Sequence, residues 1–311
     1  MKSLIGALAM YTLTALTPNA LASSEDEAAV KSVVESVAAF ADRGEFEALE
    51  RLYAPEVLVD YSSLSGAPAE LKSAAALMTE WASVLPGFDR TRHALSDVTA
   101  KVDGNTATAS ARVVADHWVG GAHWQVSGRY SYELGEFEAG WQITSMTFTL
   151  QDEVGSRDVF GPASAAAVAE PAPYIQRQQT RQVVLDFLHG LEEKDMDKVN
   201  GVWAEDAVQH MPYVPEGWST QVVGRDALIA QYGQWPEVSG QANFTDNLVF
   251  YPMLDAQTVF VEYNGVVEIL PTGLTYRQIY GGLFHVEDGK ITLFREYFDP
   301  REFERAFAMT H

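Results

Sequence analysis

The sequence predicts an α+β protein with two domains of similar fold in tandem. In each half, apolar residues first repeat at helical spacing and then give way to strand-like runs separated by turns. Residues 44–61 also align with residues 194–211 at an offset of 150, and GWQITSMTF from Gly140 parallels GKITLFREYF from Gly289. Weak matches in a consistent order favour an internal duplication.

The first domain is predicted over residues 25–154. Val30, Val34 and Val37 begin an apolar repeat at helical spacing that stops at Gly44. Further helices are expected over 45–53 and 68–85, with the extended stretch 56–61 between them. Four strand-like runs then fill 93–150, with turns at 103–105, 120–121 and 138–140. Helices followed by an antiparallel sheet define an α+β domain.

Residues 155–176 are rich in Ala and Pro, lack periodicity and are predicted to be a linker. The second domain, over 177–311, then repeats the order of the first. Val183, Phe187 and Leu191 belong to an amphipathic helix, a short helix follows over 194–203, and strand-like runs occupy 244–298.

The N-terminus has the pattern of a secretory signal peptide. Lys2 precedes a short apolar run, and Ala20-Leu21-Ala22 has the small-x-small form of a cleavage site, so residues 1–22 are expected to be removed. Thr and Tyr residues interrupt the apolar run, which is too short for a transmembrane helix. The mature protein is therefore expected to be periplasmic or secreted, without membrane association.

The acidic composition and the lack of cysteine exclude several functions. Removing residues 1–22 takes away one positive charge, Lys2, and no acid, so the net charge changes from −22 to −23. Such a surface repels nucleic acid. Zero cysteines mean no disulfide and no thiolate chemistry. The histidines show no recognisable ligand spacing, so no metal and no other cofactor is predicted.

The strand predicted over 106–120 ends in Asp116, His117 and Trp118. Successive side chains of a strand point to opposite faces, so Asp116 and His117 cannot enter the same cavity. A lone histidine at a strand end is more often a hydrogen-bonded structural residue than a catalytic one. Other motifs of the chain favour a functional role for His117.

LYAPEVLVDY after the second helix and GKITLFREYFDP near the C-terminus resemble the nuclear transport factor 2-like (NTF2-like) superfamily, also called the SnoaL-like group. The resemblance implies two cone-shaped (cystatin-like) domains, each with N-terminal helices packed on a curved antiparallel sheet around an apolar pocket. The superfamily includes dehydratases, isomerases and cyclases as well as binding modules, so the fold does not choose between them. The resemblance also implies that the two domains pair as an internal pseudo-dimer. Whether the protein forms a further homo-oligomer is left undecided by the sequence.

Over residues 30–150 the first domain resembles the scytalone dehydratase and bile-acid dehydratase branch. VDY at 59–61 is similar to that branch's IDY, TRH at 91–93 to its TQH, and His117 falls where the branch has a second catalytic histidine. The resemblance implies that Asp42 orients His117. It also implies that Asp42, Tyr61, His93 and His117 converge on one cavity as catalytic residues, with His117 inward.

Three further residues are supporting or alternative candidates in this domain: Asp60, Asp116 and Tyr130. Asp116 is expected to point away from the cavity. Tyr130 stands near a position where the dehydratase branch has a different polar residue, so the resemblance does not extend to the substrate. On its own, Asp42 would be interpreted as a solvated acid at a helix end, and Asp60 as a surface residue.

Two neutral imidazoles and a phenol meet the needs of dehydration or isomerisation. These reactions need a base for the α-proton, an acid for the leaving hydroxyl and a hydrogen-bond donor to the enolate oxygen. Histidine can serve as acid or base near neutral pH because its unperturbed pKa is about 6.5. The sequence therefore predicts a cofactor-independent lyase or isomerase that acts on a small, mostly apolar hydroxy-carbonyl or cyclic compound. The alternative is a non-catalytic periplasmic binding or scaffold protein.

The second domain does not repeat the histidine pair. Its own candidates are His210, His285, Glu296 and Asp299. The C-terminal sequence resembles the polyketide-cyclase type of SnoaL-like domain, in which an acid near this end can be the catalytic base. Glu296 and Asp299 are three residues apart, so at most one of them points inward. Asp299 before a proline is typical of a strand end, and a structural role is the first interpretation.

Overall fold

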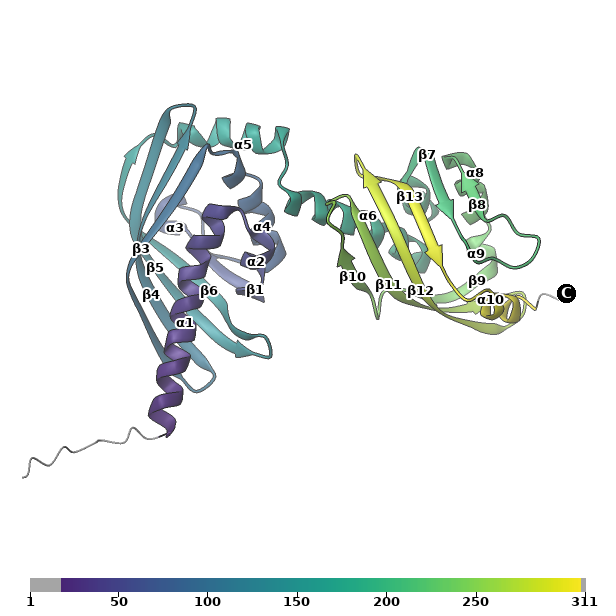
Figure 1. The fold of residues 1–311 in the computed structure, drawn as a ribbon, viewed down its shortest axis with the longest axis horizontal. Coiled ribbons are helices and arrows are strands. Elements are labelled where there is room, and N and C mark those ends of the chain that lie inside the picture. Colours follow the sequence, from purple (N-terminus) through teal and green to yellow (C-terminus); the bar gives the residue numbers. More distant parts are fainter. Residues whose placement is uncertain (1–17, 309–311) are drawn as a thin grey trace, which may run out of the picture. The chain divides into compact units, whose positions relative to one another are not determined.

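The computed structural model describes the backbone of residues 18–308 and the side chains of residues 24–308. The chain divides into two compact units between Glu170 and Pro171, and each unit has helices packed on one sheet (Figure 1). This agrees with the predicted α+β class. The pairing of the two units as an internal pseudo-dimer stays a prediction.

The first unit has a six-stranded sheet in the order β2-β1-β6-β5-β4-β3. Its strands are β1 (Tyr53–Asp60), β2 (Glu70–Ser73), β3 (Arg90–Asp103), β4 (Thr106–Val119), β5 (Ala122–Phe137) and β6 (Gly140–Gly155). Its helices are α1 (Pro18–Arg43), α2 (Phe46–Glu50), α3 (Ser62–Ser65), α4 (Ala74–Ala82), η1 (Leu85–Gly87), η2 (Arg157–Val159) and α5 (Phe160–Ala169). The four long strands and their turns are confirmed. The sheet is mixed rather than antiparallel, because β1 runs parallel to β6.

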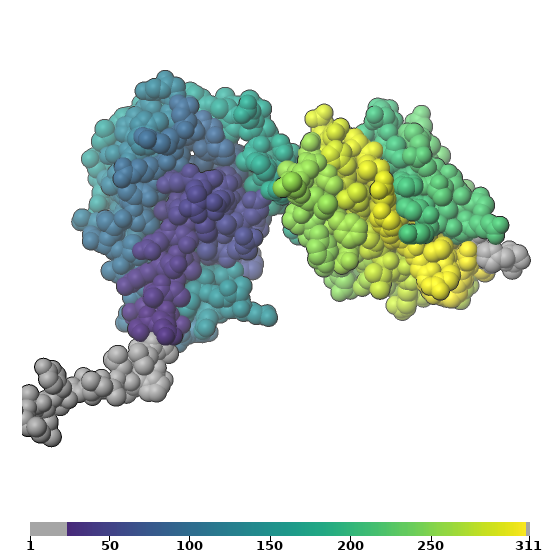
Figure 2. Space-filling view, viewed as in Figure 1, coloured from purple at the N-terminus to yellow at the C-terminus, as the bar shows by residue number. Residues whose placement is uncertain are grey.

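Helix α1 lies along the surface of the first unit and packs on β3 (Figure 2). It ends at Arg43, and Gly44 follows with φ +67°, a left-handed conformation that glycine adopts at helix ends at little cost. The predicted signal peptide lies outside the described residues, apart from the start of α1. Within residues 18–308, no helix is long and apolar enough to cross a membrane. Export stays a prediction.

The helix predicted over 68–85 is shorter in the structure. Residues 70–73 form β2, an edge strand that pairs with β1. Helix α4 begins only at Ala74, because the Ser73 hydroxyl accepts a hydrogen bond from the backbone N–H of Ala76 at 3.1 Å. Such an N-cap satisfies a free N–H group of the first helical turn and fixes where a helix starts.

The predicted linker, residues 155–176, is mostly helical in the structure. It contains η2 and α5, and Ala163 and Ala167 of α5 are buried. The guanidinium of Arg157 donates to Glu153 at 2.5 and 2.7 Å and to the Leu64 carbonyl at 2.9 Å, which ties this segment to the first unit. Alanines make the contact, so the segment has no amphipathic period that the sequence could reveal.

Replacing Gly87 with alanine is expected to loosen α5. A Cβ at Gly87 would lie 1.8 Å from the Ala163 carbonyl oxygen, a backbone atom that cannot rotate away. We expect the free energy of unfolding of the first unit to fall by about 1–3 kcal/mol, as for other overpacked contacts. Urea denaturation measures it. Gly161→Ala in α5 is the control, because its Cβ would have nothing within 4 Å. A similar loss in both variants would contradict this contact.

The second unit repeats this topology. Its sheet has the order β10-β11-β12-β13-β7-β8, with β9 also paired to β11. The strands are β7 (Trp203–His210), β8 (Gln221–Val223), β9 (Ser239–Asn243), β10 (Val249–Pro252), β11 (Thr258–Ile269), β12 (Leu274–Glu287) and β13 (Lys290–Tyr297). The helices are α6 (Pro173–Glu193), α7 (Met196–Gly201), α8 (Arg225–Tyr232), α9 (Trp235–Val238) and α10 (Pro300–Ala306). β7 is parallel to β13, as β1 is to β6, which favours the predicted duplication.

Candidate functional site

The first unit contains a cavity of about 370 Å³ between its helices and its sheet. Aromatic and aliphatic side chains form most of the wall, among them Trp81, Trp124, Phe148 and Phe160. Four of the predicted site residues also line it: Tyr61, His93, His117 and Tyr130. Phe160 belongs to α5, so the segment predicted to be a linker contributes to this cavity.

His93 and Asp42 form a hydrogen-bonded pair at the wall of the cavity. His93 Nδ1 lies 2.7 Å from Asp42 Oδ1, and the backbone N–H of His93 donates to Asp42 Oδ2 at 2.7 Å. The Thr91 hydroxyl donates to Oδ1 at 2.9 Å. Asp42 belongs to the last turn of α1, and Thr91 and His93 share one face of β3 because they are two residues apart. These contacts hold the carboxylate in one position.

The carboxyl of Asp42 is ionised at neutral pH. Burial raises its pKa, but the hydrogen bonds from His93, the charge of His93 and the hydrogen bond from Thr91 outweigh burial, so the net pKa lies below its ordinary value. Whenever the His93 ring carries a single proton, ionised Asp42 holds that proton on Nδ1. The other ring nitrogen, Nε2, then carries the lone pair and can accept a proton from a ligand.

The predicted pairing of Asp42 with His117 is wrong. Asp42 contacts His93 instead, and His117 Nδ1 is buried without a hydrogen-bond partner among the described residues. The reason is that α1 packs mainly on β3, which brings Asp42 to the backbone N–H of His93, whereas His117 lies on the next strand, opposite Thr91.

His117 points into the cavity, as predicted, and is 5% exposed. Its ring lies 5.0 Å from those of Phe88 and Trp124, measured between centroids, and 5.5 Å from that of His93. Burial, and then the charge of His93, lowers the pKa of His117 to about 4, so its ring is neutral at pH 7. An unpaired buried polar group costs about 1–3 kcal/mol, and a ligand that bonds to His117 would remove that cost.

Asp116 points to the opposite face of the sheet, as predicted. It accepts a hydrogen bond from Gln125 Nε2 at 2.7 Å, and its Oδ1 lies 2.8 Å from His123 Nε2. Asp60 also lies outside the cavity lining, and it accepts from the backbone N–H of Ser62 at 2.8 Å. Both residues therefore have structural contacts and neither borders the cavity.

Tyr61 and Tyr130 form a second polar group in the cavity wall. Burial raises the pKa of both phenols, that of Tyr61 well above its ordinary value. Both phenols therefore keep their protons at neutral pH and can donate to a ligand. The cavity combines a proton acceptor at His93 with phenol donors in an otherwise apolar wall.

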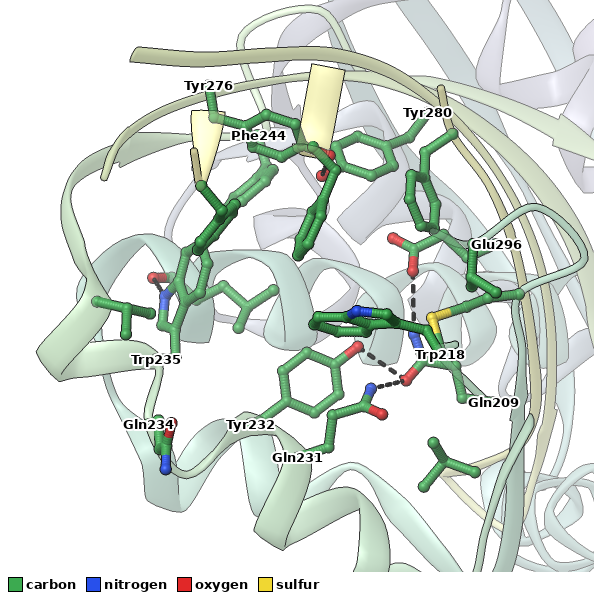
Figure 3. A pocket seen from close by; sticks show the side chains of 18 of the residues that line it. Gln209, Trp218, Gln231, Tyr232, Gln234, Trp235, Phe244, Tyr276, Tyr280 and Glu296 are labelled. Atoms are coloured by element: carbon green, nitrogen blue, oxygen red, sulfur yellow. Dashed lines mark hydrogen bonds between the residues drawn. The ribbon is translucent and has the colours of Figure 1, made fainter. Parts of the chain in front are cut away.

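The second unit contains a larger cavity, about 580 Å³, with different chemistry (Figure 3). Glu296 of β13 points into it, accepts from Gln209 Nε2 at 3.0 Å, and lies 3.4 Å from the Tyr263 hydroxyl. Gln209 Oε1 in turn accepts from Gln231 Nε2 at 2.6 Å and from the Tyr232 hydroxyl at 3.1 Å. Two donors on its oxygen fix the amide so that its N–H group faces Glu296.

Burial raises the pKa of Glu296 to about 7, and the hydrogen bonds from Gln209 and Tyr263 only partly oppose this shift. By surface area the residue is partly exposed, because the cavity itself reaches the carboxyl. Glu296 therefore changes between its neutral and charged forms near neutral pH.

The other candidates of the second domain lie outside this cavity lining. Asp299 caps α10, since its carboxylate accepts from the backbone N–H of Arg301 at 3.0 Å. His285 Nδ1 lies 2.7 Å from the Thr258 hydroxyl oxygen, and His210 ends β7. Sequence reasoning missed Gln209, although a signal existed: it shares a strand face with buried Ala207, where a polar residue is unusual.

The chain thus consists of two α+β units in tandem, and each unit has helices over a mixed sheet and an apolar cavity that holds a few polar groups. A SnoaL-like family matches residues 22–147, and a second SnoaL-like family matches residues 184–294. The chain belongs to the SnoaL-like group, with two SnoaL-like domains in tandem.

Several known proteins are similar to parts of this chain. The uncharacterized protein YesE of Bacillus subtilis (strain 168) is 33% identical over 121 residues, 39% of this chain and 82% of YesE. The PhzA/B-like protein PA3332 of Pseudomonas aeruginosa is 28% identical over 120 residues, 39% and 84% of the two chains. A solved Bacillus subtilis structure, provisionally named an isomerase, is 29% identical to this chain and has a TM-score of 0.41. The match spans 43% of this chain and 96% of the Bacillus subtilis chain. An NTF2-like protein from Burkholderia xenovorans is 24% identical, with coverages of 42% and 95% and a TM-score of 0.35.

Proposed function

We propose that the first domain is a cofactor-independent lyase or isomerase that acts on a small, mostly apolar hydroxy-carbonyl or cyclic compound. The observation that carries this proposal is the Asp42–His93 pair, held at 2.7 Å in the wall of an apolar cavity beside a neutral His117. The signal-peptide pattern of residues 1–22 supports a periplasmic or secreted location as part of the same proposal.

In the proposed dehydration, His93 Nε2 removes the α-proton of the bound carbonyl compound, and ionised Asp42 stabilises the imidazolium that forms. A phenol of the Tyr61–Tyr130 pair donates to the carbonyl oxygen, where negative charge develops. His93 then gives its proton to the leaving β-hydroxyl, so water departs and a carbon–carbon double bond forms. In an isomerisation, His93 returns the proton to another carbon. Neutral His117 hydrogen-bonds to the substrate and orients it.

Exchange of substrate protons with deuterated water tests this function. β-Hydroxy ketones and cyclic enones are incubated with the purified protein, and wild type is expected to incorporate deuterium at the α-carbon, measured by mass spectrometry. His117→Phe keeps an aromatic ring between Phe88 and Trp124 but removes both ring nitrogens. It is expected to slow exchange by about two orders of magnitude.

His123→Phe is the matched control, because His123 lies on the opposite face of the sheet and pairs with Asp116. We expect it to exchange at the wild-type rate. If His117→Phe exchanges as fast as wild type, His117 does not orient the substrate. If wild type shows no exchange across the panel, the alternative applies. The first cavity would then belong to a non-catalytic protein that binds small molecules.

A further inference from the structure

We propose that the cavity of the second domain binds a mostly aromatic or apolar molecule that carries one positively charged nitrogen. Glu296 would contact the nitrogen, and the aromatic wall would enclose the rest. The inference concerns a separate cavity and does not depend on the function proposed for the first domain.

Glu296 is the one charged residue in the lining of this cavity, as far as the side chains of residues 24–308 define it. Buried carboxylates in proteins are almost always paired with a cation or satisfied by several hydrogen bonds. Glu296 has one good hydrogen bond, from Gln209, and one long contact, with Tyr263 at 3.4 Å. In Figure 3 one carboxyl oxygen is bonded to Gln209 and the other faces the interior. The carboxyl therefore has unused acceptor capacity on the cavity side.

The hydrogen-bond network around Gln209 favours the charged form of Glu296. A protonated carboxyl would need an acceptor, but the Gln209 oxygen already accepts from Gln231 and Tyr232. Its amide N–H group therefore remains the part that faces Glu296, and it can only donate. The cavity thus holds an acceptor ready for a positive charge but supplies no such charge from its own lining. A ligand with a positively charged nitrogen would supply the charge that the lining lacks.

Aromatic rings surround the carboxyl, as expected for a site that binds an organic cation. The wall includes Trp218, Tyr232, Phe244, Tyr263, Tyr280 and Phe298. The faces of such rings attract cations, by about 0.5–1 kcal/mol at exposed sites and about 2 kcal/mol when water is excluded. Tyr263 and Tyr280 are stacked in this wall with their ring centroids 4.8 Å apart. Trp218 is 51% exposed and lies at the rim.

No other group packed around Glu296 provides a competing charge inside the described part of the cavity. Burial raises the pKa of Tyr232, Tyr263 and Tyr280 well above the ordinary value and that of Tyr276 to about 12, so these phenols stay neutral. Glu302 of α10 lies outside the lining, and its charge helps to raise the pKa of Tyr276. The basic side chains of the surrounding elements lie outside the lining: Arg177, Arg181 and His189 on α6, His210 on β7, Arg225 on α8, Arg277 and His285 on β12, Lys290 and Arg295 on β13, and Arg301 and Arg305 on α10.

A matched pair of ligands tests the charge requirement. (3-Hydroxyphenyl)trimethylammonium and 3-tert-butylphenol have nearly the same shape but differ in charge. Isothermal titration calorimetry with the full-length protein is expected to show binding of the cation at least about tenfold tighter than that of the phenol. Glu296→Gln is expected to remove this preference. Glu262→Gln, which changes an exposed carboxyl of β11 in the same domain, should leave it unchanged.

The pH dependence gives a second readout. Because burial raises the pKa of Glu296 to about 7, affinity for the permanent cation is expected to rise about tenfold per pH unit up to that pKa and then level off. In Glu296→Gln the affinity should not depend on pH. Equal binding of the two ligands, or a preference that persists in Glu296→Gln, would overturn the proposal. Tighter binding of the neutral phenol would also overturn it and would indicate a neutral ligand toward which Glu296 acts as a proton acceptor. Deuterium exchange by the first domain affects none of these outcomes.

Discussion

Asp42→Asn is expected to slow proton exchange in the first cavity by about three to four orders of magnitude. An ionised Asp42 accepts the Nδ1 proton of His93, which leaves the lone pair on Nε2, on the cavity side. Asparagine can instead donate its amide N–H to Nδ1, so the ring proton moves to Nε2 and His93 can no longer act as the base. It also provides no negative charge for the imidazolium. Loss of the correct tautomer is known to cost this much in other acid–base sites.

Two measurements separate this positioning role of Asp42 from a purely structural one. The exchange rate is compared in wild type and Asp42→Asn, and the ¹⁵N chemical shifts of the His93 ring report which nitrogen carries the proton. Asp116→Asn is the control, because Asp116 lies on the opposite face of the sheet and should change the rate by less than about tenfold. An Asp42→Asn protein with unchanged rate and unchanged tautomer would contradict the proposed base.

The residues of the first cavity could be predicted from the sequence, but their pairing could not. Strand parity correctly separated His117 from Asp116, and the family resemblance located Tyr61 and His93. Which histidine contacts Asp42 depends on how α1 packs across the sheet, and helix packing is a tertiary property that no local motif records. Thr91 was missed as a partner of the carboxylate for the same reason.

The second cavity was harder to predict because a shift of one residue reverses the faces of a strand. Aligning GWQITSMTF with GKITLFREYF at their first glycines places Glu296 beside Thr147. The strand ladders give a different match, because Asp60 pairs with Thr147 whereas His210 pairs with Arg295. By that register Glu296 corresponds to Phe148, which lines the first cavity. The duplicated fold thus has a carboxyl where the first domain has a phenyl ring.

Glu296→Gln is expected to stabilise the second domain at about pH 8 and to have little effect at about pH 4. The pKa of Glu296 is about 7 in the folded protein and 4.5 in the absence of burial. A raised carboxyl pKa means that the folded state binds the proton more tightly than the unfolded state. The stability that this proton contributes is complete below about 4.5 and is lost as the pH rises through about 7. Glutamine has a similar shape and no charge, so it avoids this loss.

The expected gain in the free energy of unfolding at about pH 8 is up to about 3 kcal/mol, because each unit of pKa difference corresponds to about 1.4 kcal/mol. Urea denaturation of wild type and Glu296→Gln across the pH range measures it, and the other carboxyl groups cancel when the two proteins are compared at each pH. Glu262→Gln is the control, because Glu262 is exposed and should show a small difference that does not follow this curve. A constant difference between wild type and Glu296→Gln at all pH values would show that Glu296 is not held in a desolvated cavity. It would also weaken the case for a cationic ligand, because a carboxylate that remains hydrated gains little from a cation in this site.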